Sequence, residues 1–281
     1  MSLGIFFLVL SAAALHAVWN ALVKSAADKS VSMTAVVMGQ GISGAICVMF
    51  LPMPVIEAWP YILGSVILHI GYQESLKAAY KVGDLTQVYP IARGVSPLLV
   101  AVFTVLVLGT KLHPIELAGV VLICCGIASL SITRRGAGER NGTATVLAIL
   151  TGCFIAGYSI LDGVGVRINR DAIGFFAWVA LLNGLTYVAF AALRTPYVFM
   201  AVRRSWWIVV VGGGASFVAY AMVVYAFLYA PIALVTALRE TSIVFALFIG
   251  VGVLKERLNL IKVFSTMLTL SGAALLRMGR S

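Results

Sequence analysis

Long apolar stretches alternate with short polar breaks along almost the whole chain. We count ten apolar segments, each close to the ~20 residues that an α-helix needs to cross a bilayer. They cover residues 3–23, 31–51, 59–80, 84–109, 114–133, 143–165, 172–193, 205–229, 231–254 and 260–277. The pattern predicts an all-α membrane protein with ten transmembrane helices. The first segment is too long, and runs too directly into the second, to be a cleaved signal peptide.

Composition supports this fold class and narrows the partners. Of the 281 residues, 62% are hydrophobic and 11% are charged, whereas a soluble domain is nearer half apolar and about a quarter charged. The net charge is +10, but the basic residues lie mostly in predicted loops, where lipid head groups account for them. We therefore expect membrane lipids and a small-molecule substrate as partners, and no nucleic acid. We also expect no cofactor, no metal and a monomer or homodimer.

The two halves of the chain are related by duplication. A shift of 146 positions aligns residues 93–130 with 239–276 without a gap, and it pairs Arg93 with Arg239 and Ser96 with Ser242. We predict a first five-helix repeat over residues 1–135, a linker over 136–142 and a second repeat over 143–281. Because five is odd, the second repeat must cross the membrane in the opposite sense, which makes the repeats inverted.

Loop charges predict an orientation. Of the 20 Lys and Arg residues, 13 flank the odd-numbered loops and five flank the even-numbered loops or the C-terminus. The positive-inside rule then places the odd loops in the cytoplasm and both termini outside.

Two arginines lie inside apolar segments. Arg93 sits between Pro90 and Pro97 in the fourth segment, and Arg239 sits in the ninth. An arginine at the bilayer centre costs at least ~2.5–3.5 kcal/mol on insertion scales, so it normally faces a polar interior and a partner. Each proline removes a backbone donor, so we expect the helix to be locally opened around Arg93. An interrupted helix with a charge at membrane depth indicates a transport site.

Other polar residues recur at helical spacing and complete a candidate site. The substrate-binding candidates are Arg93, Arg239, Lys77, Tyr89, Trp19, Asn20, Gln73 and Tyr220. The proton-coupling candidates are Glu74, Glu240, Asp162, His16 and His69. Structural alternatives remain for several of them. Lys77 can snorkel to head groups, the two histidines can be neutral donors between helices, the arginines can form structural ion pairs, and Asp162 can lie at the membrane interface.

Glycines and cysteines inside the segments are interpreted as packing residues. The run from Gly39 to Gly44 formally matches a dinucleotide-binding fingerprint, but it lies in an apolar segment with no preceding strand, which favours helix packing. The Gly212–Gly214 triplet is interpreted as a close helix contact or a hinge. The four cysteines lack metal-ligand spacing and are interpreted as packing residues: Cys47, Cys124, Cys125 and Cys153.

The duplication, Trp19 within His16-Ala17-Val18-Trp19-Asn20, and the segment ends Leu108-Gly109 and Leu254-Lys255-Glu256 resemble the drug/metabolite transporter superfamily, in its ten-helix EamA-type branch. The first half departs from the usual Gly-Glu by having Gly109-Thr110. The resemblance implies that the fifth and tenth helices lie at the periphery, that the other eight enclose a cavity, and that the termini are cytoplasmic. The stretches 16–24 and 89–94 are more narrowly similar to EamA-type proteins associated with phosphonate utilisation.

These features favour a secondary transporter in the cell (inner) membrane, not an enzyme. It would carry a small polar, anionic metabolite by alternating access between the inverted repeats. A guanidinium matches a carboxylate, phosphate or phosphonate bidentately. A flippase for a phosphorylated lipid is the alternative, and a gap between helices would favour it. A non-transporting membrane subunit or an intramembrane enzyme is a third reading, which the number of interior charges and the lack of a visible catalytic arrangement disfavour.

Overall fold

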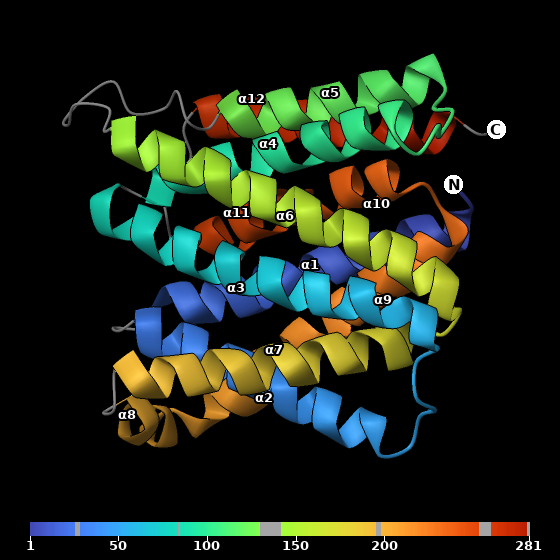
Figure 1. Cartoon of the computed structure of the whole chain (residues 1–281). Helices are drawn as coiled ribbons and strands as arrows, with labels where there is room; N and C mark the ends of the chain where they lie inside the picture. The colour runs from blue at the N-terminus through green and yellow to red at the C-terminus, as the bar shows by residue number, and fades with distance from the viewer. Residues whose placement is uncertain (26–28, 84, 130–141, 195–197, 253–259, 280–281) are drawn as a thin grey trace.

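The computed structural model describes residues 1–25, 29–83, 85–129, 142–194, 198–252 and 260–279, and the predicted linker 136–142 lies almost wholly outside them. The described residues contain helices and no strand (Figure 1). The first half holds α1 (Leu3–Ser25), α2 (Lys29–Val48), the short turn η1 (Ile56–Ala58), α3 (Trp59–Val82), α4 (Leu85–Leu106) and α5 (Pro114–Ser129). The second half holds α6 (Gly142–Asn169), α7 (Ala172–Arg194), α8 (Val198–Arg204), the π-helical η3 (Ile208–Gly212), α9 (Gly213–Tyr229), α10 (Ile232–Arg239), α11 (Ser242–Gly252) and α12 (Leu260–Met278).

These helices account for the ten predicted crossings. Seven helical stretches within the described residues are long and apolar enough to span a membrane, and one of them, Ile232–Ile249, joins α10 to α11. Helix α5 and the Val263–Met278 part of α12 are shorter apolar helices. Helix α3 has 24 residues, ample for a span, but carries Glu74, Lys77 and Lys81 near its end. Both termini lie at the same end of the bundle, as an even number of crossings requires (Figure 1).

The helix that breaks is the ninth and not the fourth. Helix α4 continues through Pro90 and Pro97, so the predicted opening around Arg93 is wrong; a proline removes one hydrogen bond, and packing against α5 and α6 holds α4 together. The ninth segment instead divides between Arg239 and Ser242. The break keeps its backbone bonded in a tight turn, with Glu240 N–H donating to Ala237 O at 3.1 Å.

The two halves interleave. Helix α1 packs against α9 and α11, while its equivalent α6 packs against α3 and α4. Duplication relates α3 to α9 and α4 to the α10–α11 pair, so each half makes the same contacts to the other. Helices α2 and α7 pair at one side of the bundle and α5 and α12 at the opposite side (Figure 1). The fold is therefore two inverted five-helix repeats, with α5 and α12 at the periphery.

Glycines allow close approach where the halves meet. A Cβ on Gly39 would lie 1.9 Å from Val209 O, and one on Gly184 would lie 2.7 Å from the Cα of Gly41. The first glycine run therefore serves helix packing. Gly213 faces Gly39 in the same contact, whereas Gly214 has nothing within 4 Å, so the close-contact interpretation of the triplet does not extend to its last member.

The cysteine interpretation is only half right. Cys124 is buried and Cys47 is partly buried, as packing residues should be. Cys125 and Cys153 are exposed on the outer surface of the bundle. Adjacent residues of a helix point in different directions, so Cys125 faces outward although Cys124 is buried.

Candidate substrate site

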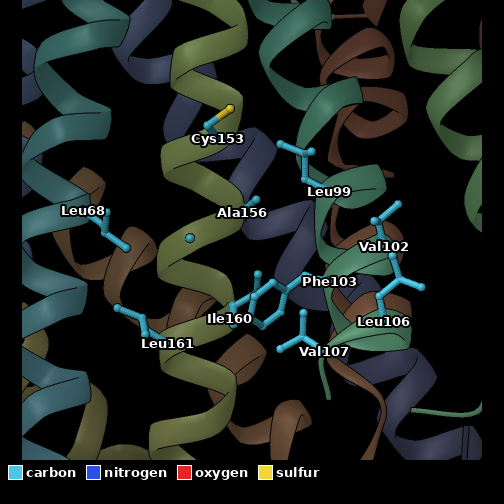
Figure 2. A pocket seen from close by; sticks show the side chains of 11 residues that line it. Leu68, Leu99, Val102, Phe103, Leu106, Val107, Cys153, Ala156, Ile160 and Leu161 are labelled. Atoms are coloured by element: carbon cyan, nitrogen blue, oxygen red, sulfur yellow. The ribbon is translucent and has the colours of Figure 1, made fainter. Parts of the chain in front are cut away.

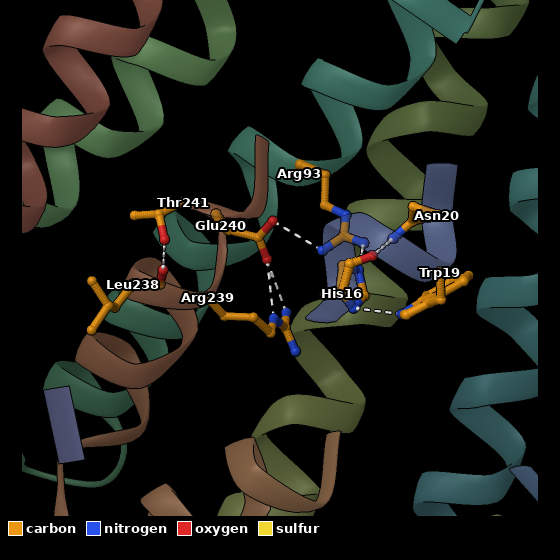
Figure 3. Close-up of polar contacts among 8 residues, drawn as sticks. All are labelled: His16, Trp19, Asn20, Arg93, Leu238, Arg239, Glu240 and Thr241. Carbon is orange, nitrogen blue, oxygen red and sulfur yellow. Dashed lines mark hydrogen bonds and ion pairs between the residues drawn. The ribbon is translucent and has the colours of Figure 1, made fainter. Parts of the chain in front are cut away.

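A buried cluster joins the two arginines from opposite halves (Figure 3). Arg93 on α4 donates from Nη1 to Glu240 Oε2 at 3.0 Å. Arg239, the last residue of α10, donates from Nε and Nη2 to Glu240 Oε1 at 3.2 and 3.0 Å. The three residues are 5%, 2% and 1% exposed for Arg93, Arg239 and Glu240. The break after α10 is what allows Glu240, adjacent in sequence to Arg239, to lie between the two guanidinium groups.

His16 extends this cluster toward α1. Arg93 Nη2 contacts His16 Nε2, and Trp19 Nε1 donates to His16 Nδ1 at 3.2 Å. Arginine and tryptophan side chains only donate, so both ring nitrogens face donors, and a neutral imidazole can accept at only one of them. A protonated His16 does not fit this arrangement. Asn20 donates to His16 O at 2.8 Å, so its amide is engaged with its own helix and not with an arginine.

The cluster carries a net positive charge. With His16 neutral, Arg93 and Arg239 contribute two positive charges and Glu240 one negative charge. Each guanidinium also lies over the ring of a tyrosine. The Arg93 Cζ is 5.2 Å from the Tyr89 ring centroid, and the Arg239 Cζ is 6.0 Å from the Tyr220 ring centroid. Desolvated charges are costly unless they are fully compensated. The three side chains of Arg93, Arg239 and Glu240 therefore keep one positive charge without a counter-charge among themselves.

Buried polar atoms on α3, α4, α10 and α11 lack a hydrogen-bond partner among the described residues. Ser96 and Ser242 are 0% and 2% exposed, and neither hydroxyl has a hydrogen-bond partner in the described structure. The same holds for Thr236 Oγ1, one turn before Glu240, and for Gln73 Oε1 on α3. A buried group left unbonded costs about 1–3 kcal/mol. The two serines occupy equivalent positions of the repeats, each three residues after an arginine, and this sequence identity is the signal that distinguishes them from other serines.

An aromatic layer separates the arginine cluster from a buried carboxylate. Tyr220 on α9 donates its hydroxyl to Asp162 Oδ2 on α6 at 2.7 Å, and Asp162 is 0% exposed. His69 on α3 stacks on Tyr158, with ring centroids 4.0 Å apart, and meets Tyr220 edge-on at 5.9 Å. His69 Nδ1 donates to Ser65 O at 2.9 Å. Asp162 is thus buried inside the bundle, and Ser65, which the sequence does not single out, joins the layer.

Lys77 and Glu74 belong to a separate cluster. Lys77 pairs with Glu74 one turn earlier and lies over the Tyr187 ring at 5.0 Å. Glu74 also lies 3.6 Å from Arg194 of α7, whose side chain is 65% exposed. These groups lie near the C-terminal ends of α3 and α7. The Lys77 amine is therefore held by Glu74 near the end of the helix, and its part in substrate binding stays a prediction.

An apolar groove opens on the outer face of α6, between α3 and α4 (Figure 2). Its volume is about 510 Å³. The lining is aliphatic and aromatic apart from Cys153 and Gly157, and it includes neither Arg93 nor Arg239; it comprises Leu68, Leu99, Val102, Phe103, Leu106, Val107, Cys153, Ala156, Gly157, Ile160 and Leu161. The groove fits an acyl chain but offers no group that would bind a charged head.

Comparison with known proteins agrees with this architecture. The model of the EamA-like transporter family matches residues 2–132 and again 142–278. One solved crystal structure aligns over 98% of this chain and 98% of its own, with a TM-score of 0.78 and 18% sequence identity; at that identity the likeness shows the fold alone. No curated protein sequence matches the chain significantly.

The apolar helices and the match over both repeats identify a multi-pass membrane protein of a family of small-molecule transporters. The chain belongs to the EamA-like transporter family.

Proposed function

We propose that the protein is a secondary transporter of a small anionic metabolite, in the cell membrane, and that Arg93 and Arg239 bind the anionic group. The observation that carries the proposal is the shared carboxylate: Glu240 bonds both arginines and leaves one positive charge uncompensated. Planar guanidinium groups match a carboxylate, phosphate or phosphonate. The unpartnered hydroxyls of Ser96 and Ser242 supply further hydrogen bonds from equivalent positions.

The position of the cluster suits alternating access. Arg93 and His16 belong to the first repeat, and Arg239 and Glu240 belong to the second, so the site straddles the interface at which inverted repeats move relative to one another. The Glu74–Arg194 pair also bridges the repeats, at one end of the bundle. An anion that competes with Glu240 for Arg93 would replace this direct contact between the repeats by a contact that runs through the substrate.

The test is binding and uptake of defined anions. Inorganic phosphate, methylphosphonate and succinate are compared with the neutral ester dimethyl methylphosphonate. We expect at least one anion, and not the ester, to raise the unfolding temperature of the purified protein and to enter proteoliposomes. Arg93→Lys keeps the positive charge but loses the paired N–H donors of the guanidinium. The free energy of anion binding should therefore weaken by roughly 1–3 kcal/mol, while the protein still folds.

The ion-pair alternative makes a different prediction. If Arg93 serves only to neutralise Glu240, the double variant Arg93→Gln/Glu240→Gln should recover part of the stability lost in Glu240→Gln, with Arg239 still unpaired, and should transport at the wild-type rate. A stable Arg93→Ala protein with wild-type uptake would end the substrate-binding role.

A flippase for a phosphorylated lipid is the second candidate, and the apolar groove on α6 is the observation that favours it. The groove would take an acyl chain while the arginines take the phosphate. Translocation of fluorescent phosphatidic acid across reconstituted vesicles tests it. Replacing Cys153, which is exposed and lines the groove, by Trp should block lipid movement and leave uptake of a water-soluble anion unchanged.

A further inference from the structure

We propose that Asp162 is the proton-binding site of the transporter, and that a proton and the substrate anion bind together. The inference rests on the proposed function and names its coupling ion. Asp162 is a carboxylate that the arginine cluster does not use, placed one aromatic side chain away from it.

Asp162 is buried without a cationic partner. It is 0% exposed, its Oδ2 accepts the Tyr220 hydroxyl at 2.7 Å, and its Oδ1 has no hydrogen-bond partner among the residues that the structure describes. It takes part in none of the ion pairs among the described residues. An ionised carboxylate in such a place is costly, and a proton removes the cost. Glu240 and Glu74, the other carboxylates considered for this role, are each held by two basic side chains.

The groups that face Asp162 favour reversible protonation. Ser65 lies against it from α3, where it also contacts His69 Nδ1 at 3.2 Å. Tyr220 of α9 donates its hydroxyl to the Asp162 carboxylate, and Arg239 of α10 lies within electrostatic range of that carboxylate. Tyr158, on the same helix as Asp162, lies within electrostatic range of that carboxylate and of Arg93 on α4. Donors and distant positive charges make the ionised form accessible, and the absence of a direct cation among the described residues keeps the protonated form accessible as well.

Charge balance links this proton to the anion. Five charged side chains are buried among the residues whose burial is described: Arg93, Glu116, Asp162, Arg239 and Glu240. Glu116 lies apart, at the start of α5, where its Oε2 accepts the His113 N–H. The remaining four sum to zero when all are ionised. Protonation of Asp162 leaves one positive charge, and a bound monoanion restores neutrality. A proton and a monoanion then cross together without net charge movement.

Tyr220 connects the two sites physically. Its ring lies beneath the Arg239 guanidinium at 6.0 Å, and its hydroxyl bonds Asp162. Linkage requires that a proton raise the affinity for the anion by the same factor by which the anion raises the affinity for the proton. The affinity for the anion should therefore be highest at acidic pH and fall as Asp162 ionises, by about 5- to 150-fold for typical coupling.

Infrared difference spectroscopy across a pH titration tests the proton site without any substrate. We expect a protonated-carboxyl band that disappears on alkalinisation in the wild type and is absent from Asp162→Asn. Glu116→Gln, which changes the buried carboxylate at the start of α5, is the matched control and should keep the band. Tyr220→Phe removes one donor to the ionised form, so the band should persist to higher pH. A wild-type spectrum unchanged by Asp162→Asn would overturn the proposal.

Proton uptake on anion binding tests the coupling. The probe is methyl methylphosphonate, whose single acidic group stays ionised across the titration, so any proton taken up binds the protein. In weak buffer the wild type and Glu116→Gln should take up a proton for each anion bound, while Asp162→Asn should bind the anion with no uptake and no pH dependence. Binding without uptake in the wild type overturns the coupling alone. Failure of every anion to bind would instead remove the proposed function, and this inference with it.

Discussion

Glu240 is the side chain on which both buried arginines depend. Each of its carboxylate oxygens accepts from a different guanidinium, at 3.0 Å in the closest contacts. Removing the carboxylate leaves two cations unpaired, whereas removing Arg93 leaves Glu240 still bonded to Arg239. The two changes should therefore differ in their effect on the free energy of unfolding.

We predict that Glu240→Gln destabilises the protein by about 3–5 kcal/mol, the usual cost of breaking a buried ion pair, and that Arg93→Gln costs less. Thermal unfolding in detergent, followed by tryptophan fluorescence, measures both. Glu74→Gln is the control, because it breaks a partly exposed pair worth at most about 1 kcal/mol. Equal unfolding temperatures for Glu240→Gln and Glu74→Gln would contradict the central role of Glu240.

At the scale of the element, close packing at Gly39 is a structural requirement that Gly214 does not share. We predict that Gly39→Ala is destabilising by about 1–3 kcal/mol or more, because its methyl group would overlap Val209 O. Gly214→Ala should be stabilising by about 0.5–1 kcal/mol, because alanine favours the helix and nothing lies within 4 Å. Urea unfolding of both variants, side by side, provides the comparison. Similar losses in the two variants would count against the α2–α9 contact.

Hydrophobic length and repeat identity predicted the helices, but not which helix would break. Pro90 and Pro97 gave a local reason for a break in the fourth segment, and packing overrode it. The ninth segment breaks at Glu240 and Thr241, where the sequence has neither proline nor glycine. Its signal was the duplication itself: Glu240 replaces Gly94 of the first repeat, so a charge enters the second repeat beside an arginine.

The sequence predicts which residues face the interior of the bundle better than it predicts which of them contact one another. Helical spacing collected Arg93, Arg239, His16 and Asp162 because polar residues inside apolar segments must face the interior. Spacing within one helix could not tell that Arg93 pairs with Glu240, nor that Lys77 is engaged by Glu74, because those choices depend on how helices pack between the repeats.

For the whole molecule, the loop charges and the family resemblance predict opposite orientations. From the 13 basic residues at odd loops against five elsewhere, we predict termini outside. A single cysteine at Ser281, in a chain with its four native cysteines replaced, should react with an impermeant maleimide added to intact cells. Reaction only after the membrane is opened would favour the cytoplasmic termini that the resemblance implies.

The pairing of Arg93 with Glu240 also has a consequence for biogenesis. The two residues are 147 positions apart, so at about 5–20 residues per second the ribosome reaches Glu240 roughly 7–30 seconds after Arg93. During that interval the nascent first repeat holds a membrane-buried cation whose permanent partner has not yet been synthesised. During synthesis the Arg93 guanidinium therefore needs a temporary partner, such as a polar group of the translocon or a lipid phosphate. Arg93 must dissociate from that partner when the second repeat inserts.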